Sequence, residues 1–517
     1  ATVPAGQFRD VAKSLRDDPQ MRFDLLLCMT GMDWGETLGV VYHLRSTELG
    51  HEIVLRTETA DRENPELQSV YDLWESANLN EREVYDFFGI RFIGHPDMRR
   101  LYLRNDWVGY PFRKDYNASP DVNPVRLDSD ETLDTAPAYE LKDGKVEKHE
   151  NVLFENDEYV VNIGPQHPAT HGVLRFRVSL AGETVQKVDV HCGYIHRGIE
   201  KMCESLTYPQ TLALTDRLDY LSAHQNRHAL CMCIEQAMGI EIPERVQYIR
   251  TIMDELNRLS SHLLFWSTLC MDLGALTAFF YGFRDREIVL DMMEETTGGR
   301  LIQNYNMIGG VAADIHPNLV KRGKAFIKYL PKMLDEYDEV FTGNVIAQQR
   351  LKGIGVLPKE VAVSYGVTGP SGRASGWSCD VRKLKPYGVY DKVQFDEVIR
   401  TGGDSFDRYL VRVDEIRQSL HILEQLIDNI PAGDYAVKTK PIIRLPEGQF
   451  FSSVEASRGE FGVYIESRGD KFPYRMKFRS PGLPLVSVVD YLASGSKIAD
   501  LIAIGGSLDY VVPDIDR

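Results

Sequence analysis

Two histidines, His167 and His171, lie on a short segment that glycine and proline keep out of regular structure. The segment, residues 164–172, reads Gly-Pro-Gln-His-Pro-Ala-Thr-His-Gly. Pro168 lacks a backbone donor and its ring obstructs a helix, so the four-residue spacing cannot place both histidines on one helical face. Because imidazole can bind a metal or transfer a proton near neutral pH, metal binding, acid–base chemistry and a structural turn all remain open.

Strand-like sequence flanks the histidine segment on both sides. Residues 159–161 are Tyr-Val-Val, and beyond the segment large apolar residues alternate with polar ones, as a half-buried strand requires: Leu174, Phe176, Val178 and Leu180 against Arg175, Arg177 and Ser179. We therefore expect a β-hairpin whose connection carries the two histidines. His191 and His196 follow, but no Cys-x-x-Cys pair or carboxylate spacing completes a metal site with them.

Several other catalytic patterns are missing from the sequence. There is neither a Gly-x-Gly-x-x-Gly after a strand nor a Gly-x-x-x-x-Gly-Lys-Ser/Thr loop, so no nucleotide site is predicted, and we interpret the glycine-rich residues 366–373 as a structural loop. No Gly-x-Ser-x-Gly elbow or His-Glu-x-x-His occurs. The cysteines are scattered without a Cys-x-x-Cys pair, which suits a reducing compartment and predicts packed thiols at Cys231 and Cys233 rather than an iron–sulfur cluster.

Length and charge narrow the class of protein. The 517 residues favour more than one domain. A formal net charge of −17 argues against nucleic-acid binding and against unaided binding to an anionic membrane, since both usually need basic patches. No apolar run approaches the roughly 18 to 20 residues that a transmembrane helix needs, and no signal peptide is evident.

The chain divides into three regions by composition. Residues 1–116 mix an amphipathic helix at 8–15 with strand-like runs at 39–44 and 52–56, which predicts a small α/β domain. Residues 117–150 are acidic, contain prolines and have few aliphatic residues, so we expect a solvated linker. Residues 151–517 are mainly helical with β-containing ends: helices are predicted from Pro243 through Leu264 and at 406–430, and a strand at 461–466.

The first region resembles a known component of a respiratory enzyme. Residues 81–90 read Glu-Arg-Glu-Val-Tyr-Asp-Phe-Phe-Gly-Ile, and they are followed by Gly-His-Pro-Asp at 94–97, Arg-Arg-Leu at 99–101 and Gly-Tyr-Pro-Phe-Arg-Lys-Asp-Tyr at 109–116. This run is similar to the hallmark of the C-type subunit of bacterial respiratory complex I. The resemblance implies that these charges and turns build the fold and dock neighbouring subunits, so no chemistry is assigned to them.

The region from about 155 to 517 resembles the D-type, quinone-site subunit of the same complex. The similarity rests on the histidine segment 164–172, His-Arg-Gly-Ile-Glu-Lys, Asp-Arg-Leu-Asp-Tyr, Met-Asp-Leu-Gly-Ala and Asp-Ile-Asp-Arg, at 196–201, 216–220, 271–275 and 514–517. The chain thus resembles a bacterial fusion of both subunits. The implied fold is α+β multidomain, with a D-type region like the large subunit of nickel–iron hydrogenases without its metal site.

The resemblance assigns roles to four residues. It implies that His171 and Tyr220 flank the quinone headgroup, one near each carbonyl, and that Asp272 hydrogen-bonds His171. Quinone reduction consumes two protons, and a phenol with an imidazole can supply them near neutral pH. A neighbouring carboxylate would favour the charged imidazole. Arg197 is implied to lie toward a [4Fe-4S] cluster on a partner subunit, whose potential a cation would raise.

The implied activity belongs to an assembled enzyme. The resemblance points to a proton-pumping NADH:quinone oxidoreductase, in which this chain would take electrons from the partner cluster and use menaquinone or ubiquinone as substrate, with NAD bound only elsewhere. The implied partners are a cluster-bearing B-type subunit, a ferredoxin-like I-type subunit, membrane-embedded H-type and A-type subunits and an NADH-dehydrogenase module. The implied location is the cytoplasmic face of the bacterial inner membrane, as a peripheral subunit.

Three departures and two alternatives accompany the resemblance. Ile302 follows Leu301 where many relatives have a histidine linked to cluster redox chemistry, which makes a low-potential menaquinone conceivable; residues 440–451 are shorter than in many relatives; and residue 1 enters the C-type region after its usual start. A hydrogenase would need two Cys-x-x-Cys pairs, but Ile195 replaces the partner of Cys192 and the last cysteine is Cys379. A scaffold that does not touch quinone is the other alternative.

Overall fold

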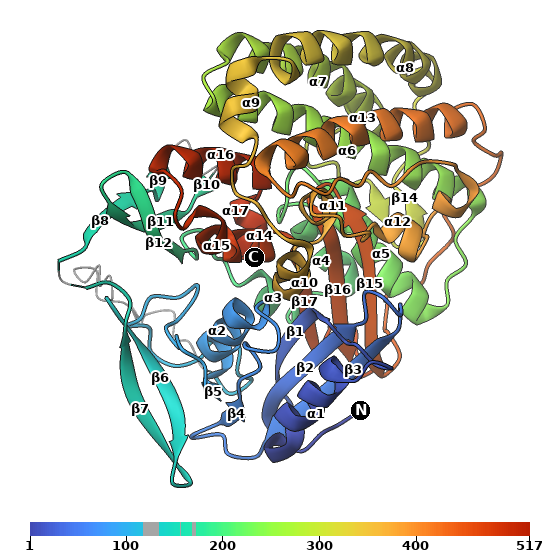
Figure 1. Cartoon of the computed structure of the whole chain (residues 1–517). Helices are drawn as coiled ribbons and strands as arrows, with labels where there is room; N and C mark the ends of the chain where they lie inside the picture. The colour runs from blue at the N-terminus through green and yellow to red at the C-terminus, as the bar shows by residue number, and fades with distance from the viewer. Residues whose placement is uncertain (117–133, 156, 168–171) are drawn as a thin grey trace.

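The computed structural model describes residues 1–116, 134–155, 157–167 and 172–517. Its N-terminal part is built on a three-stranded antiparallel sheet of β1 (Leu25–Asp33), β2 (Leu38–Arg45) and β3 (Glu52–Thr59). Helix α1 (Ala5–Asp17) contacts β3, and α2 (Ala77–Phe88) packs on β1 (Figure 1). The predicted helix and both predicted strands of this region are confirmed.

Strand β1 was not predicted, because its side chains do not alternate between apolar and polar. Every residue of β1 is buried, since the sheet is covered on both faces. Met32 and Val41 pack against Tyr464, which belongs to the C-terminal sheet. A strand buried on both sides loses the period-two pattern on which prediction from sequence depends.

The predicted linker is described from Asp134 onward, and this part forms a hairpin. Strands β6 (Thr135–Lys142) and β7 (Lys145–Val152) pair antiparallel around a turn in which Asp143 and Gly144 have positive φ. Such a two-residue turn matches the twist of a hairpin. Most side chains of the hairpin are exposed. The hairpin therefore has the polar composition expected of a solvated linker, although its backbone forms regular strands.

The larger part of the chain combines helices with small sheets. Helix α6 (Glu244–Asp272) is central and contacts α5 (Ala223–Met238), α7 (Leu276–Thr297) and α13 (Ser405–Leu426). As predicted, α6 begins after Pro243; the predicted helix at 406–430 is confirmed but ends at Leu426. The C-terminal sheet has the order β15–β16–β17 (Gly448–Ala456, Gly459–Ser467 and Arg475–Arg479), and β16 confirms the strand predicted at 461–466.

Shorter elements connect these parts. In chain order they are β4 (Glu66–Gln68), β5 (Arg91–Ile93), β8 (Tyr159–Ile163), β9 (Gln166–His167), β10 (Gly172–Val173), β11 (Arg175–Ala181), β12 (Thr184–His191), α3 (Ile199–Cys203), α4 (Tyr208–Thr215), β13 (Asn306–Met307), β14 (Gly310–Val311), α8 (Asn318–Tyr337), η2 (Asp338–Thr342), α9 (Val345–Leu351), α10 (Lys359–Tyr365), α11 (Gly369–Ala374), α12 (Val381–Leu384), η3 (Tyr390–Lys392), α14 (Gly482–Ser487), α15 (Val489–Ala493), α16 (Ile498–Leu508) and α17 (Val512–Asp516). Together they form a mixed α/β structure (Figure 1).

The N-terminal part shares its hydrophobic core with the C-terminal part. One buried cluster includes residues of α1, β1 and α2 together with residues of β11, β12, α10 and α14 to α17. Buried ion pairs cross the same boundary: Arg45 binds Glu460, and Glu83 binds both Lys477 and Arg517. The two parts are therefore joined by an interface that resembles a protein interior.

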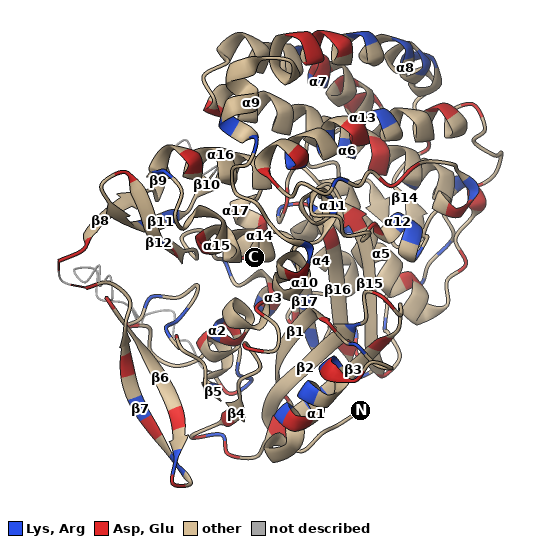
Figure 2. Ribbon diagram, viewed as in Figure 1, with Lys and Arg blue, Asp and Glu red and all other residues tan. Residues whose placement is uncertain are grey.

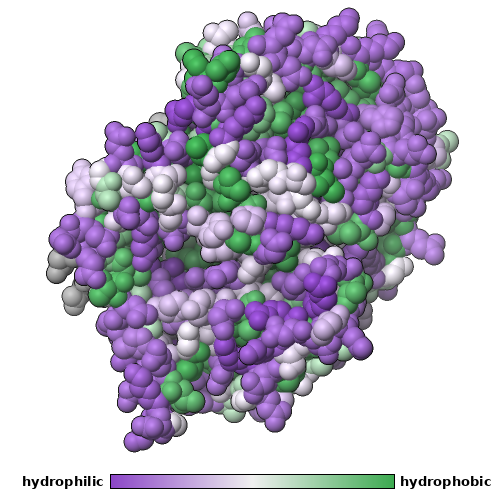
Figure 3. Space-filling model, in the orientation of Figure 1, coloured by the Kyte–Doolittle hydropathy of each residue, from purple (hydrophilic) through white to green (hydrophobic). Residues whose placement is uncertain are grey.

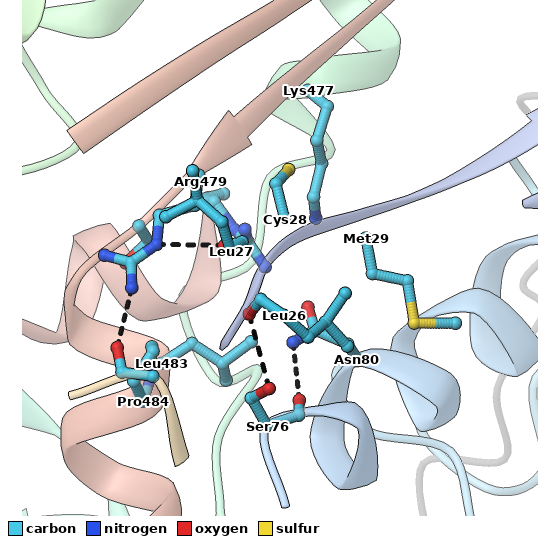
Figure 4. Close-up of a pocket in the computed structure, with 13 residues that line it drawn as sticks. Leu26, Leu27, Cys28, Met29, Ser76, Asn80, Lys477, Arg479, Leu483 and Pro484 are labelled. Atoms are coloured by element: carbon cyan, nitrogen blue, oxygen red, sulfur yellow. Dashed lines mark hydrogen bonds between the residues drawn. The ribbon is translucent and has the colours of Figure 1, made fainter. Parts of the chain in front are cut away.

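A small cavity marks this boundary between β1 and β17. Its volume is about 20 Å³, and Arg479 donates a hydrogen bond to the carbonyl oxygen of Leu27 at its edge (Figure 4). On the other side Ser76 donates to the carbonyl oxygen of Leu26. A space of this size has room for about one water molecule, so it is a packing feature rather than a ligand site.

The glycine-rich residues 366–373 have the structural role that was predicted. They form the start of α11, where the fully buried Arg373 forms ion pairs with Glu415 and with Glu455. A Cβ on Gly369 would lie 2.3 Å from the Cα of Gly459, so β16 approaches too closely for any side chain there. The segment fixes the bundle against the C-terminal sheet.

All seven cysteines are free and buried, including Cys231 and Cys233, as predicted. Across the part of the chain that the structure describes, no helix combines the length and the apolar character needed to cross a membrane. Acidic and basic residues are interspersed along the β6–β7 hairpin and over α7 and α8 (Figure 2). The face in Figure 3 is hydrophilic over most of the helical bundle, with apolar residues scattered among polar ones.

Candidate functional site

The predicted hairpin around the histidine segment is present. Strand β8 pairs antiparallel with β11, and the connection between them contains the two-residue strands β9 and β10. His167 is exposed in β9 and pairs with Gly172, whereas His171 lies outside the described residues. A Cβ on Gly172 would lie 2.6 Å from Cγ2 of Val512, so this end of the segment touches the start of α17.

The predicted alternation along β11 is only partly correct. Phe176 and Val178 are buried as expected, but Arg177 and Ser179 are buried too. Arg177 forms an ion pair with Asp134, and its guanidinium lies 4.6 Å from the ring centroid of Phe154. The segment at 134–154 therefore covers the face of the strand that was expected to meet solvent.

Tyr220 lies between α4 and α5 with 38% of its surface exposed. Directly before it, Asp219 accepts a hydrogen bond from Arg458 at 3.0 Å, and Arg458 also binds Asp509 at 3.0 Å. Burial raises the pKa of the Tyr220 phenol above its usual value, and the positive charge of Arg458 opposes this shift. Tyr220 is thus held in its proton-carrying form at neutral pH beside a buried ion-pair network.

Asp272 is the last residue of α6 and lies against α16. A Cβ on Gly506 would come within 2.9 Å of its Oδ2 atom. Burial raises the pKa of the Tyr510 phenol, and the negative charge of Asp272 adds to this shift. The carboxylate of Asp272 therefore lies near both α16 and Tyr510.

The C-terminal residues 506–512 are the common neighbour of the candidate site residues. Asp272 approaches Gly506, the network next to Tyr220 includes Asp509, and the histidine segment reaches Val512 through Gly172. Prediction from sequence missed this segment. The signal was the pair of glycines at 505 and 506 inside an otherwise apolar helix, where glycine usually marks a close packing contact.

Arg197 belongs to a different part of the site. It is exposed, and it forms no ion pair with a residue that the structure describes. The preceding turn is fixed by Asp516, whose carboxylate accepts from the backbone N–H groups of Gly193 and Ile195 at 2.8 and 3.0 Å. Burial raises the pKa of this carboxyl to about 6, and the two hydrogen bonds oppose the shift. The turn before Arg197 is thus attached to α17, and Arg197 forms no hydrogen bond or ion pair with Tyr220 or Asp272.

A cavity of about 380 Å³ lies beside this turn, between the N-terminal part and β11–β12. Figure 3 shows the surface hollowed between them. Arginines line much of it, but most of their charge is already balanced: Arg99 binds Asp97 and Asp189, and Arg100 binds Asp86. We assign no ligand to this cavity.

The remaining histidines have protein partners. His191 forms a hydrogen bond with Asp189 at 2.8 Å, and Nδ1 of His196 lies 2.6 Å from the carbonyl oxygen of Asp516. Within the described ranges, no three His, Cys, Asp or Glu side chains are grouped so that they could hold a metal ion. A histidine metal site therefore gains no geometric support from these residues.

Known proteins match both parts of the chain. The family model of the 30 kDa subunit of respiratory-chain NADH dehydrogenase matches residues 1–122, and the model of the 49 kDa subunit of the same enzyme matches residues 272–444 and 440–517. The C/D subunit of the NADH-quinone oxidoreductase of Phocaeicola vulgatus is 67% identical over 517 residues, which cover 100% of this chain and 99% of the relative.

The chain belongs to the family of fused C/D subunits of NADH-quinone oxidoreductase. A more distant member of this C/D family, from Nitrosospira multiformis, is 37% identical over 92% of this chain and 83% of the relative. The separate D subunit of the NADH-quinone oxidoreductase of Geobacillus kaustophilus is 43% identical over 71% of this chain and 100% of its own length. The resemblance of the sequence to a fused complex I subunit is thereby confirmed.

Proposed function

We propose that this chain forms the quinone-reduction site of a proton-pumping NADH:quinone oxidoreductase, with Tyr220, His171 and Asp272 at the reacting headgroup. The main support for the proposal is that the parts of the chain that carry these residues all approach the C-terminal residues 506–512. Gly172, the residue after His171, reaches Val512, while Asp272 reaches Gly506. Arg458 binds both Asp509 and Asp219, the residue before Tyr220. Three distant parts of the sequence thus meet one short C-terminal segment.

The chemistry of the residues fits proton delivery to a quinone. A phenol ordinarily loses its proton only near pH 10, and burial raises the pKa of Tyr220 further, so the phenol carries a proton at neutral pH that it can donate to a carbonyl oxygen. His171 is the second proposed donor, since imidazole titrates near neutral pH. Asp272 would orient the imidazole and favour its charged form.

Exposed apolar side chains next to Asp272 support an apolar substrate. Met271, Leu276 and Phe280 are 38%, 56% and 59% exposed, and they lie at the end of α6 and in the first turns of α7. Large apolar groups that remain uncovered usually mark a binding surface. A quinone with its hydrocarbon tail, or the subunit that guides it, would cover them.

Further parts of the proposal concern the assembly. The electrons would come from a [4Fe-4S] cluster on a B-type partner near Arg197. The I-type, H-type and A-type subunits and an NADH-dehydrogenase module would complete the enzyme, which would lie at the cytoplasmic face of the membrane. Ile302 supports menaquinone as the substrate. We also propose that the chain divides into a C-type domain at 1–116, a linker at 117–150 and a D-type domain at 151–517, and that the D-type domain has a hydrogenase-like fold. The two family matches support separate C-type and D-type parts, because one ends at residue 122 and the other starts at residue 272.

Substitution in the assembled complex tests the site. Tyr220→Phe removes the phenolic proton and should lower quinone reduction about a hundredfold, in the range of general-acid contributions. His171→Ala should have a similar effect and Asp272→Asn a smaller one. Reduction of ferricyanide, which takes electrons upstream of quinone, should not change.

The matched control is Tyr491→Phe, because Tyr491 is a comparably exposed tyrosine (45%) on α15. It should leave both activities intact. If Tyr220→Phe and His171→Ala retain full quinone reduction, the chain acts as a scaffold and the reacting quinone binds elsewhere.

A further inference from the structure

Arg286 is a buried cation that the fold does not neutralise. It lies on α7 with 6% of its surface exposed, and its Nε donates one hydrogen bond to the carbonyl oxygen of Ser260 at 3.2 Å. It forms no ion pair with any residue that the structure describes. Its terminal nitrogens have no hydrogen bond to a described residue, and neither is sealed from solvent.

Arg458 and Arg408 are buried arginines whose terminal nitrogens do have hydrogen-bond partners in the fold. Arg458 binds two carboxylates, those of Asp219 and Asp509. Arg408 has no carboxylate within ion-pair distance, but its guanidinium donates to two carbonyl oxygens and two serine hydroxyls. The guanidinium of Arg286 lies 5.9 Å from the ring centroid of Phe283 but has no such polar partners among the described residues, and burial without them costs free energy.

One stretch of α6 connects Arg286 with the ion-pair network beside Tyr220. Arg286 donates to the carbonyl oxygen of Ser260, and the hydroxyl of the next residue, Ser261, accepts from Arg458, which also binds Asp219. Arg286 and Arg458 both lower the pKa of the Tyr220 phenol, whereas Asp219 and Asp509 raise it. Arg458 is already balanced by these same two carboxylates, which leaves Arg286 as the uncompensated cation among the groups that act on the phenol. The acidic neighbour of Arg286 in sequence, Glu287, is itself paired with Arg300.

We propose that Arg286 is a positioning residue of the quinone site, whose guanidinium stabilises the negative charge that Tyr220 acquires when it gives up its proton. This inference rests on the proposed function. The iron–sulfur cluster proposed for a partner subunit would supply two electrons to the quinone. The O–H bond of Tyr220 then breaks and a new O–H bond forms on a substrate oxygen that carries the added electrons. Arg286 stabilises the charge left on the phenolic oxygen until solvent returns a proton.

A double-mutant cycle in the assembled complex tests whether Arg286 acts through Tyr220. Arg286→Gln should lower the turnover number for quinone reduction about tenfold, because the phenolate would lose a stabilising positive charge. The KM for quinone should change less, because Arg286 is assigned to the charged intermediate state. In the Tyr220→Phe background, Arg286→Gln should have no further effect, since no phenolate forms there.

Conservative and control variants separate this role from a structural one. Arg286→Lys keeps the positive charge and should restore turnover to within about threefold of the wild type. Arg284→Gln, two residues away on α7, removes a partly exposed arginine that is paired with Asp285 and Glu336, and it should leave quinone reduction unchanged. Ferricyanide reduction by each complex reports whether the upstream enzyme has assembled.

The outcomes distinguish the two proposals. If Tyr220→Phe has full activity, the proposed proton donor is wrong. If Tyr220→Phe is impaired while Arg286→Gln is fully active, or while the double variant loses the product of the two single effects, the role of Arg286 is wrong and the quinone site stands. Failure of Arg286→Lys to restore turnover would likewise assign Arg286 to packing.

Discussion

The buried carboxylates of the N-terminal part differ in how their charge is balanced. Glu83 is shared by Lys477 and Arg517, whereas Glu81, two residues earlier on the same helix, accepts only from the Ser69 hydroxyl and the Val70 N–H. Burial raises the pKa of Glu81 to about 8, although both hydrogen bonds oppose the shift. Glu81 therefore keeps its proton in the folded protein at neutral pH.

Glu81 should make the stability of the protein depend on pH. The unfolded chain loses this proton near pH 4.5 and the folded chain near pH 8, so stability is greatest below the first value and falls as pH rises between them. Between pH 6 and pH 8 the melting temperature of the wild type should fall by roughly 3 °C or more relative to Glu81→Gln. Differential scanning fluorimetry across this range measures the difference.

The exposed Glu63 provides the control for Glu81. Glu63→Gln should follow the wild-type curve at every pH. Other buried acids titrate in the same window, but they are common to both proteins and cancel in the comparison. Parallel curves for the wild type and Glu81→Gln would mean that Glu81 is already ionised in the folded state.

Sequence motifs identified some single residues of the candidate site and missed others. Tyr220 and Asp272 lie in recognisable sequence motifs, so the resemblance could assign roles to them. Arg286 lies in no such motif, and its importance depends on the lack of polar partners around it in the folded structure. In the same way, Glu81 and Glu83 belong to one motif, and only the folded structure distinguishes the unpaired carboxyl from the paired one.

Among the secondary-structure elements, those with a distinctive residue composition were predicted well. Helix α6 has an apolar stripe and a clear start at Pro243, and β2 and β3 were recognised from their β-branched residues. Strand β2 is buried as completely as β1, but β1 was missed because its run of leucine, cysteine and methionine fits a buried helix equally well. Helix α2 was missed as well, since four of its buried residues, Glu81, Arg82, Glu83 and Asp86, are charged and find partners only in the folded chain.

Helix α16 should control the proposed site through its backbone. Gly506→Ala would place a methyl group 2.9 Å from Oδ2 of Asp272 and 3.2 Å from Cδ1 of Leu269, so the carboxylate or the helix must move. We expect quinone reduction by the assembled complex to fall about tenfold, with a cost in stability of about 1–3 kcal/mol. Quinone and ferricyanide assays on the same preparation separate the two effects.

The corresponding change in a helix without such a neighbour is Gly6→Ala in α1, where no atom lies within 4 Å of the added methyl group. It should leave activity unchanged and stabilise α1 slightly, by about 0.5–1 kcal/mol. Full quinone reduction by Gly506→Ala would show that the position of Asp272 does not matter for the reaction.

The C-type and D-type parts are joined as tightly as a single domain. They share one buried core, and their cross-boundary ion pairs are withdrawn from solvent. In Geobacillus kaustophilus the D-type relative matches 71% of this chain with its whole length, so that part exists there as a separate polypeptide. The fusion therefore links two surfaces that already fit each other.

A chain divided between Tyr116 and Asp134 should remain assembled. The two fragments, produced together, are expected to copurify through an affinity tag on the N-terminal fragment. Lys477→Met in the divided protein leaves Glu83 and Glu200 with one buried cation fewer, at a cost of about 3–5 kcal/mol, and should reduce recovery of the C-terminal fragment more than a hundredfold.

Lys352→Met is the control for the divided protein, since the ammonium group of Lys352 bonds Gln348 on the surface. It should not change recovery. Separate elution of fragments that carry no substitution would mean that the covalent connection, rather than the buried interface, holds the two parts together.

The burial of all seven cysteines also makes the folded chain unreactive toward thiol reagents. Each thiol is withdrawn from solvent and burial raises its pKa, so little thiolate is present to react: Cys28, Cys192, Cys203, Cys231, Cys233, Cys270 and Cys379. One new cysteine on the surface, for example at the β6–β7 turn, would accept a spin label or fluorophore without removal of the native ones. Distance measurements in the assembled enzyme would then contain no background from labelled native cysteines of this chain.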